Sequence, residues 1–289
     1  MNPEFSIDIL LAVYNGEKYL SALLDSVFSQ SYTNWRLLVR DDGSTDSSID
    51  ILKNYQQKYP GKIVIVKDNL SRLGIAANFG ELMKQTNTDY IMFCDQDDIW
   101  LPNKIELSIK VMRATEKEYP DLPIMVHTDL QVVDENLNLI DNSMWHLNAI
   151  DPQTANDFSM LIVRNAVTGC AMMINRKAKN LSLPIPAEAA VHDWWIAMST
   201  AKTGKIIEIP IAAILYRQHK ANVIGANVRK KTLIPAPNRL SNYKNTIRNH
   251  CNLVKKIAPE VNTFTLATKI IISEVIRKIK QKSLRSYLK

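Results

Sequence analysis

Three carboxylates, Asp95, Asp97 and Asp98, lie within four positions, directly after an apolar run at residues 90–94. Carboxylates this close repel one another, and a hard divalent cation relieves the repulsion because it prefers oxygen ligands and is often shared with substrate phosphates. The same residues could instead form a solvated acidic turn that caps a helix expected to begin near residue 101. The spacing alone leaves metal–phosphate chemistry and a helix cap both open.

The apolar run before the carboxylates predicts a buried parallel strand, and ligand sites in open α/β sheets form beyond the carboxyl ends of such strands. In the first part of the chain, strand-like and helical segments alternate at roughly 30-residue spacing, which predicts βαβ units and a mostly parallel sheet. The expected strands are residues 5–13, 35–39, 62–66 and 89–94, and the expected helices are residues 17–30, 49–59, 75–85 and 101–119.

Beyond residue 119 this regular alternation ends. A polar segment at residues 134–138 is typical of a hairpin turn, and from residue 240 onward only helical spacing appears. The expected strands here are residues 123–128, 131–140, 168–175 and 205–215, and the expected helices before residue 240 are residues 152–163 and 192–201.

The composition is that of an ordinary soluble globular protein, since 46% of the 289 residues are apolar and 22% are charged. No apolar run approaches the about 18 residues needed to span a bilayer, and the N-terminus lacks signal-peptide features. Cys94, Cys170 and Cys251 are odd in number and far apart, which argues against a disulfide framework or a zinc site and favours a reducing cytoplasm. Neither a G-x-G-x-x-G motif nor a P-loop is present, so dinucleotide-binding and P-loop functions lose their main support.

The net charge of +7 is unevenly distributed along the chain. Residues 229–289 hold 15 Lys or Arg against two Glu, a balance of +13, whereas residues 1–228 have a balance of −6. A basic segment on a mildly acidic body suggests a polyanionic partner. We therefore place a boundary at residue 229.

Several segments, taken in order, resemble glycosyltransferase family 2, whose members have the α/β GT-A fold. Those that match the family's nucleotide-binding half are residues 12–16 (AVYNG), 39–46 (VRDDGSTD) and 95–98 (DQDD), while residues 94–100, 168–170, 192–195 and 216–219 resemble its bacterial rhamnosyltransferase-like branch. The resemblance covers about residues 5–226. It implies a mostly parallel central sheet flanked by helices, with residues 1–120 binding the nucleotide-sugar, residues 121–228 binding the acceptor, and residues 229–289 as a basic helical extension.

The resemblance also implies how a donor is held. Asp42 would accept a hydrogen bond from the nucleobase, although it could equally form a local turn or helix cap. Asp97, Asp98 and His219 would bind Mn²⁺ or Mg²⁺, which stabilises the departing diphosphate, and Arg217 would contact phosphate. A lone histidine or a loop arginine is otherwise more often structural or solvated. The implied donor-binding residues are Ala12, Tyr14, Asn15, Asp42, Arg72, Gly74, Asp95 and Asp97.

Asp193 is the general base that the resemblance implies. The family's usual Glu-Asp pair appears here as His192-Asp193, so the first acid does not carry over. A carboxylate beside two tryptophans at a helix start is partly desolvated, which raises its pKa towards that of a useful base. Alternatively, Asp193 only caps the helix, and the tryptophans only fill the core. The implied acceptor-binding residues are Trp100, Thr168, Gly169, His192, Trp194 and Trp195.

The basic extension is predicted to contact an anionic membrane surface. Residues 270–279 place apolar side chains on one helical face with lysines on both sides, which is typical of helices that lie on anionic lipid. A solvated face packed on the domain and a nucleic-acid arm are the alternatives. Because a lipid-linked glycan acceptor would be found at a membrane, we favour a peripheral location on its cytoplasmic face and expect no nucleic acid partner.

Together these features predict an inverting, metal-dependent transfer of sugar from a dTDP- or UDP-sugar to a bacterial surface-polysaccharide acceptor, with L-rhamnose from dTDP-L-rhamnose as the best candidate. A UDP-hexose-dependent transferase of the same fold is the nearest alternative. A sugar-nucleotide pyrophosphorylase would carry a Gly- and Arg-rich phosphate loop near its N-terminus, whereas residues 13–17 are poor in both. A non-catalytic module that binds nucleotide-sugars is the remaining alternative.

Overall fold

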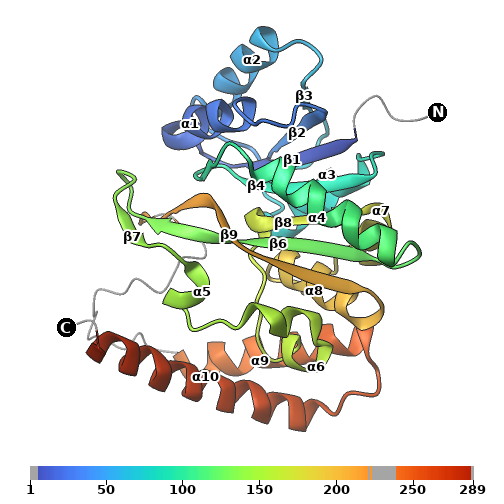
Figure 1. Ribbon diagram of the computed structural model, residues 1–289, viewed down its shortest axis with the longest axis vertical. Helices are drawn as coiled ribbons and strands as arrows, with labels where there is room; N and C mark the ends of the chain where they lie inside the picture. The colour runs from blue at the N-terminus through green and yellow to red at the C-terminus, as the bar shows by residue number, and fades with distance from the viewer. Residues whose placement is uncertain (1–5, 221, 223–238, 288–289) are drawn as a thin grey trace.

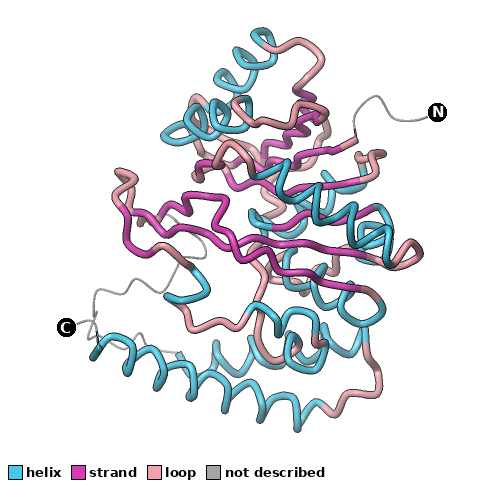
Figure 2. Tube along the Cα trace, in the orientation of Figure 1, coloured by secondary structure: helices cyan, strands magenta, loops and turns pink. Residues whose placement is uncertain are grey.

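A nine-stranded mixed sheet forms the centre of the molecule, with helices on both faces (Figures 1 and 2). This computed structural model describes residues 6–220, 222 and 239–287. The strands are β1 (Ile7–Val13), β2 (Trp35–Asp41), β3 (Ile63–Ile65), β4 (Tyr90–Asp95), β5 (Ile99–Trp100), β6 (Ile124–Val133), β7 (Leu139–Asp141), β8 (Met172–Asn175) and β9 (Lys205–Arg217). The helices are α1 (Glu17–Phe28), α2 (Ser48–Lys58), α3 (Ile75–Lys84), α4 (Lys104–Glu118), α5 (Met144–Leu147), α6 (Phe158–Leu161), α7 (Arg176–Ser182), α8 (His192–Thr203), α9 (Arg239–Ile257) and α10 (Thr263–Tyr287), with 3₁₀ turns η1 (Pro152–Asn156) and η2 (Gly169–Ala171).

The strand order is β3-β2-β1-β4-β8-β6-β9-β5, and β7 pairs with β6. The first four strands are parallel, which confirms the expected βαβ half, whereas β8 is antiparallel to both of its neighbours. The chain adds β2 and β3 on one side of β1 and then β4 on the other. The carboxyl ends of β1 and β4 therefore flank a topological switch point, where α/β sheets bind their ligands.

Burial on both faces of the sheet explains the continuous apolar runs of the first strands. Along β1, Ile9 and Leu11 belong to the core cluster under α1, α2 and α4, while Leu10 belongs to the cluster under α3 and α8. Side chains alternate between the faces of a strand, so a strand covered on both sides is apolar at every position. This pattern made the parallel half of the fold predictable.

The structure departs from the expected elements at three notable places, two in the second half of the chain and one at the start of α4. Residues 124–133 form the single strand β6 where two strands were expected, and its register with β9 shifts around Asp129. The helix expected at 152–163 is divided into η1 and α6, because the Asp157 side chain accepts from the backbone N–H groups of Ser159 and Met160 and starts a new helix. Helix α4 begins at Lys104 after the N-cap Asn103, so Asp98 is not its cap.

The C-terminal helices α9 and α10 contact each other and lie along the edge of the molecule farthest from α2 (Figure 1). Helix α9 packs on α8 and contributes Cys251, Leu253 and Val254 to the core cluster that contains Leu10 of β1. The expected helical character from residue 240 is confirmed. Among the described residues, no helix combines the length and the apolar character that crossing a bilayer requires.

Candidate active site

The loops that follow β1 and β4 are bonded to each other at the switch point. The backbone N–H of Tyr14 donates to the Gln96 side-chain oxygen (2.9 Å), and the Gln96 amide donates back to the Tyr14 carbonyl (3.0 Å). A Cβ at position 16 would lie 2.5 Å from the same Gln96 oxygen, so Gly16 is required for this close approach. The two loops therefore form one rigid edge beside the expected donor site.

The loops after β1 and β2 are also joined, through Asn15 and Asp41. Asn15 adopts a left-handed backbone conformation (φ 49°), donates its N–H to the Ser44 hydroxyl and accepts from the Thr45 N–H. Asp41 accepts from the backbone of Gly43 and Ser44 and from the Ser44 hydroxyl. Of the two consecutive acids, then, Asp41 shapes the turn, whereas the Asp42 carboxylate makes other contacts.

Asp42 is buried and holds the loop between β3 and α3. Its carboxylate accepts from the backbone N–H groups of Leu73 and Gly74 (both 2.9 Å) and from Arg40 (3.1 Å). Arg40 is 1% exposed and also forms a bidentate pair with Asp68. Burial lowers the pKa of Arg40, but the bonds to Asp68 and Asp42 outweigh it and raise that pKa overall. Asp42 thus fixes the loop that carries the other predicted donor contacts.

Tyr14 and Arg72 meet above this loop and are exposed to solvent. The Arg72 guanidinium donates to the Tyr14 hydroxyl (2.6 Å) and lies over its ring at 4.9 Å. Arg72 has a left-handed backbone (φ 58°), and its N–H bonds the Asp42 carbonyl (3.1 Å). The structure therefore brings Tyr14, Asp42 and Arg72 together, while Ala12 lies beside Asp95 in the β1–β4 ladder.

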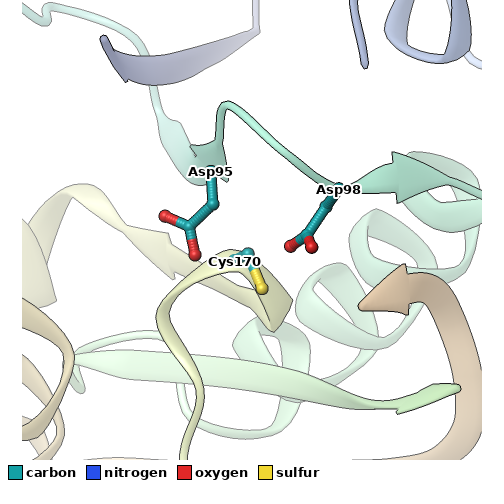
Figure 3. A group of neighbouring side chains, drawn as sticks. All are labelled: Asp95, Asp98 and Cys170. Carbon is teal, nitrogen blue, oxygen red and sulfur yellow. The ribbon is translucent and has the colours of Figure 1, made fainter. Parts of the chain in front are cut away.

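Asp95 and Asp98 converge on Cys170 from the ends of β4 and β5 (Figure 3). One potential ligand atom from each of the three lies within 4.8 Å of the others. Burial, followed by repulsion from Asp97 and Asp193, raises the pKa of Asp95 to about 7. Burial and the same kind of repulsion raise the pKa of Asp98 well above its usual value, and its Oδ2 bonds no described residue.

Lys104 provides the positive charge in this buried group. Its ammonium lies 3.6 Å from the centre of the Trp100 ring and bonds no described residue. Burial lowers the pKa of Lys104 to about 8, while the nearby acidic groups, Asp98 and Asp95 among them, oppose the shift. Burial also raises the pKa of the Cys170 thiol. A hard cation prefers oxygen ligands, so within this group the carboxylates of Asp95 and Asp98 are the side chains that suit it.

Asp97 and His219 form a second grouping, which is less buried. The His219 Nε2 lies 2.7 Å from Asp97 Oδ2, and the Asn222 amide donates to the same oxygen (3.2 Å). The side chains of His219 and Asp97 are 12% and 18% exposed. A carboxylate oxygen and an imidazole nitrogen that already converge fit a divalent cation. Asp98, expected as the third ligand, instead lies with Asp95 because its Oδ1 accepts the Arg217 N–H (3.0 Å).

Arg217 joins the end of β9 to the acidic loop. Its guanidinium donates to the backbone carbonyls of Asp97 (2.8 Å) and Glu135 (2.9 Å) and lies 4.5 Å from the Tyr19 ring. The side chain is buried, at 4% exposed. In this conformation Arg217 therefore braces the segment that carries His219.

Asp193 is held by nitrogen donors at the first turn of α8. Its carboxylate accepts from the backbone N–H of Gly169 (3.0 Å), from the backbone N–H of Trp194 and from the Asn165 amide (3.2 Å). Burial raises the pKa of Asp193 to about 6, and these three donors partly oppose the shift. Val191 and not Asp193 is the N-cap of α8, so the alternative role as a helix cap is not the one observed.

Most of the aromatic residues predicted to bind acceptor lie inside the protein. Trp100 and Trp195 are 2% and 7% exposed, and the Trp195 indole donates to the Ser182 carbonyl. His192 is 3% exposed and packs on the rings of Phe79 and Phe93. In this conformation His192, Trp100 and Trp195 therefore do not face an acceptor.

Thr168 and Trp194 are half-buried beside Asp193. Gly169 packs so closely that a Cβ there would lie 2.8 Å from the His192 ring. Of the predicted acceptor residues, Gly169 and Trp194 donate backbone N–H groups to the Asp193 carboxylate, and Thr168 directly precedes Gly169.

Four residues that shape the site were not singled out in the sequence: Arg40, Gln96, Lys104 and Asn165. A cation within an apolar strand was a usable signal for Arg40, since a buried arginine needs carboxylate partners. Asn165 had no comparable signal, because its partner Asp193 is distant in sequence and only the fold joins them. Lys104 is near Trp100 and Asp98 in the sequence, but no local pattern indicated that its ammonium is buried with them.

Among protein families, the model for Glycosyl transferase family 2 matches residues 8–181. An uncharacterized glycosyltransferase of Nostoc sp., alr2836, is 27% identical over 223 residues, which is 75% of this chain and 66% of that protein. The dTDP-rhamnosyl transferase RfbG of Shigella flexneri is 29% identical over 239 residues, 76% of this chain and 75% of that protein. The chain thus spans just under two thirds of the length of the Nostoc relative.

Solved structures with the same fold include S. aureus TarS 1-349 in complex with UDP-GlcNAc, with a TM-score of 0.59 and 16% identity over 92% of this chain and 70% of that one. The mannosyltransferase PcManGT from Pyrobaculum calidifontis, in complex with GDP-Man and Mn²⁺, has a TM-score of 0.56 and 14% identity over 97% of this chain and 71% of that one. At these identities the likeness is one of fold.

Proposed function

Because this chain belongs to glycosyl transferase family 2 and has the GT-A fold, we propose that it is an inverting, metal-dependent glycosyltransferase. The observation that carries the proposal is the position of Asp193. Its carboxylate is oriented by three N–H donors, one of which is Gly169, and the next residue, Cys170, lies within 4.8 Å of Asp95 at the switch point. A base and a donor site therefore meet at the end of β4.

In the proposed reaction an acceptor hydroxyl attacks the anomeric carbon of the bound donor. The hydroxyl proton passes to a carboxylate oxygen of Asp193, and the bond from the anomeric carbon to the diphosphate oxygen breaks on the opposite face of the sugar. With a pKa of about 6, Asp193 is mostly ionised at pH 7 yet more basic than an ordinary aspartate. The backbone donors keep the carboxylate aimed while it gains the proton.

The proposed ligands of the divalent cation are Asp97 and His219. When bound, Mn²⁺ or Mg²⁺ would neutralise the charge that develops on the leaving diphosphate. Asp98 was expected to complete this set, but its Oδ1 accepts the Arg217 N–H and its carboxylate lies with Asp95 and Cys170. Arg217 supports the site by bracing the Asp97 backbone.

The proposed donor is dTDP-L-rhamnose, and the proposed acceptor is a lipid-linked bacterial glycan. The relative RfbG, named as a dTDP-rhamnosyl transferase and 29% identical to this chain, supports this choice over a UDP-hexose. For the nucleobase we propose a site on the exposed surface that Tyr14 and Arg72 form together near Asp42, since both side chains offer a stacking face. Membership of the family disfavours the pyrophosphorylase alternative.

Two measurements would test the proposal. Thermal shifts with dTDP- and UDP-sugars, with and without Mn²⁺, report donor binding, and release of the nucleoside diphosphate reports turnover. A ligand at about 100 times its Kd stabilises the folded state by about 2.7 kcal/mol, and this should raise the Tm by several degrees. Asp193→Asn should keep the Mn²⁺-dependent shift and lose turnover, whereas His219→Ala should lose the Mn²⁺ dependence. A shift without turnover in the unaltered protein would favour the non-catalytic module, and no shift with any donor would refute the proposal.

For the C-terminal helices we propose a docking role on an anionic membrane surface. On α10, Phe264, Ile272 and Val275 are 81%, 52% and 52% exposed, and Ile271 and Ile276 are also exposed. At 3.6 residues per turn these positions share one side of the helix, opposite the buried Leu266. With the +13 balance of residues 229–289, an apolar face in a basic segment matches the chemistry of anionic lipid.

Co-sedimentation with phosphatidylcholine vesicles, with and without phosphatidylglycerol, would test this docking. The unaltered protein should sediment only with the anionic vesicles, and less at high salt. Replacing Ile272 and Ile276 by serine should abolish sedimentation. Val64→Ser provides the control, because Val64 is a similarly exposed apolar residue in β3, far from α10 (Figure 1). Equal binding to neutral vesicles, or full binding of the double variant, would contradict the proposal.

A further inference from the structure

The segment from Leu161 to Gly169 surrounds the carboxylate of Asp193. The Asn165 amide donates to one carboxylate oxygen (3.2 Å), and the Gly169 N–H donates to the other (3.0 Å). The Asn165 side-chain oxygen in turn accepts from the Val167 N–H (3.0 Å), which fixes the orientation of the amide. The direction of the carboxylate therefore depends on where this segment lies.

The beginning of the segment is anchored by two aromatic side chains. The Trp194 indole donates to the Leu161 carbonyl (2.8 Å), and the His250 Nε2 donates to the next carbonyl, that of Ile162 (2.6 Å). Trp194 directly follows Asp193 in α8, whereas His250 belongs to α9. Two consecutive carbonyls are thus held by two separate helices.

The two aromatic side chains also stack on each other. The His250 ring lies 3.9 Å from the Trp194 ring, centroid to centroid, with 24° between the planes. His250 is 8% exposed, and the adjacent Cys251 and nearby Val254 belong to the core. Helix α9 therefore contacts both the residue next to Asp193 and the segment that bonds its carboxylate.

From this geometry we propose that His250 is a positioning residue for the base: helix α9 holds the 161–169 segment and Trp194 so that Asn165 and Gly169 aim the Asp193 carboxylate. The proposal rests on the role of Asp193 given above. It makes α9 part of the catalytic unit. A carboxylate displaced by a fraction of an ångström loses rate without loss of donor affinity, since misplacing a reacting group by about 1 Å can cost about 100-fold.

Steady-state kinetics of four variants would test the role of His250. His250→Ala removes the ring and the donor, His250→Phe keeps a stacking ring, and His250→Gln keeps a donor for the Ile162 carbonyl. We expect kcat to fall by about 10- to 100-fold in His250→Ala and by less in the other two, with the KM for donor unchanged in all three. Arg248→Ala, an exposed change on the same helix, should keep the kcat of the unaltered protein.

Asn165→Ala, combined with His250→Ala, shows whether the two residues act on the same group. If His250 acts through the segment, the double variant should lose little more kcat than the larger single loss, because the two effects are not additive. Asp193→Asn serves as the reference variant. If it kept a turnover near that of the unaltered protein, Asp193 would not be the general base. Loss of turnover in Asp193→Asn with normal kcat in His250→Ala would overturn the positioning role alone, and so would a rise in KM without a fall in kcat.

Discussion

At the scale of single residues, Asp193 combines two opposing influences on one carboxylate. Burial disfavours the charged form and raises the pKa, while the bonds from Trp194, Gly169 and Asn165 favour the charged form and lower it. The resulting value of about 6 lies where a base is both ionised and effective at neutral pH. Asp95, with a pKa of about 7, titrates nearby, so the two groups ionise over overlapping ranges.

The first prediction is that activity falls as the pH drops below about 7, because the base must be ionised to accept the proton of the acceptor. Asn165→Ala removes one donor to the ionised form and should move the acidic limb of the rate profile to higher pH. The measurement is kcat/KM for transfer between pH 5 and 9, with the Arg248→Ala variant as the control. An acidic limb near pH 4, which is the ordinary pKa of aspartate, would contradict a raised pKa of Asp193.

The second prediction concerns Gly169, which packs against His192 and Asp193. A Cβ added there would lie 2.8 Å from the His192 ring and 3.5 Å from the Asp193 carboxylate. Because the ring is packed on Phe79, Gly169→Ala should lower the free energy of unfolding by about 1–3 kcal/mol and reduce kcat. Urea unfolding and turnover would measure both effects.

Gly80→Ala is the matched control for that change. Its Cβ would meet Ile185 at 3.6 Å, an ordinary contact, and alanine favours the helix by about 0.5–1 kcal/mol over glycine. Equal stability of the two variants would show that the contact of Gly169 with His192 carries no strain.

At the scale of elements, the loop between β3 and α3 depends on one buried arginine. Arg40 bonds Asp42 and Asp68 and also donates to the Leu70 carbonyl, so it joins the end of β2 to the loop that carries Arg72. Arg40→Met should cost about 3–5 kcal/mol, because it leaves the Asp42 charge buried without its partner. The KM for donor should rise as the loop loses its anchor.

Chemical denaturation and donor titration would measure these two effects of Arg40→Met. Lys53→Ala is the control, since Lys53 and its partner Asp50 are exposed and such pairs contribute at most about 1 kcal/mol. If Arg40→Met lowers the stability but keeps the donor affinity, the loop between β3 and α3 is not part of the donor site.

The sequence predicted best those elements whose burial is uniform along the strand. Strands β1, β2 and β4 are covered on both faces and are largely apolar, with interruptions at Asp8, Arg36 and Arg40, so the parallel half and the acidic residues at its edge could be predicted. The pattern of β6 is broken near its register shift at Asp129, whose carboxylate accepts from the Ser143 hydroxyl and the Trp145 N–H at the start of α5, partners that no local pattern in β6 could reveal. Likewise, no local pattern could reveal that Asp98 turns towards Cys170 and away from His219.

At the scale of the whole molecule, charge and packing divide the chain differently. The charge balance suggested a boundary at residue 229, yet α9 beyond it lies in the same core cluster as β1. Charge reports on the solvent-facing side of a helix, whereas the buried side decides whether it belongs to the domain. The C-terminal helices have both: a packed side on α8 and, on α10, an exposed apolar side.

The last prediction separates these two sides by one substitution on each. Leu253 in α9 is 4% exposed, so Leu253→Ala should lower the free energy of unfolding by about 2–5 kcal/mol and shift the urea midpoint of the whole domain. Ile272→Ala on the exposed side of α10 should change it by at most about 0.5 kcal/mol. Because α9 also holds the 161–169 segment through His250, Leu253→Ala should lower kcat before the domain unfolds, and Ile272→Ala should not. If Leu253→Ala left stability and turnover intact, α9 would not be part of the domain core, and the boundary at residue 229 suggested by charge would be the true domain boundary.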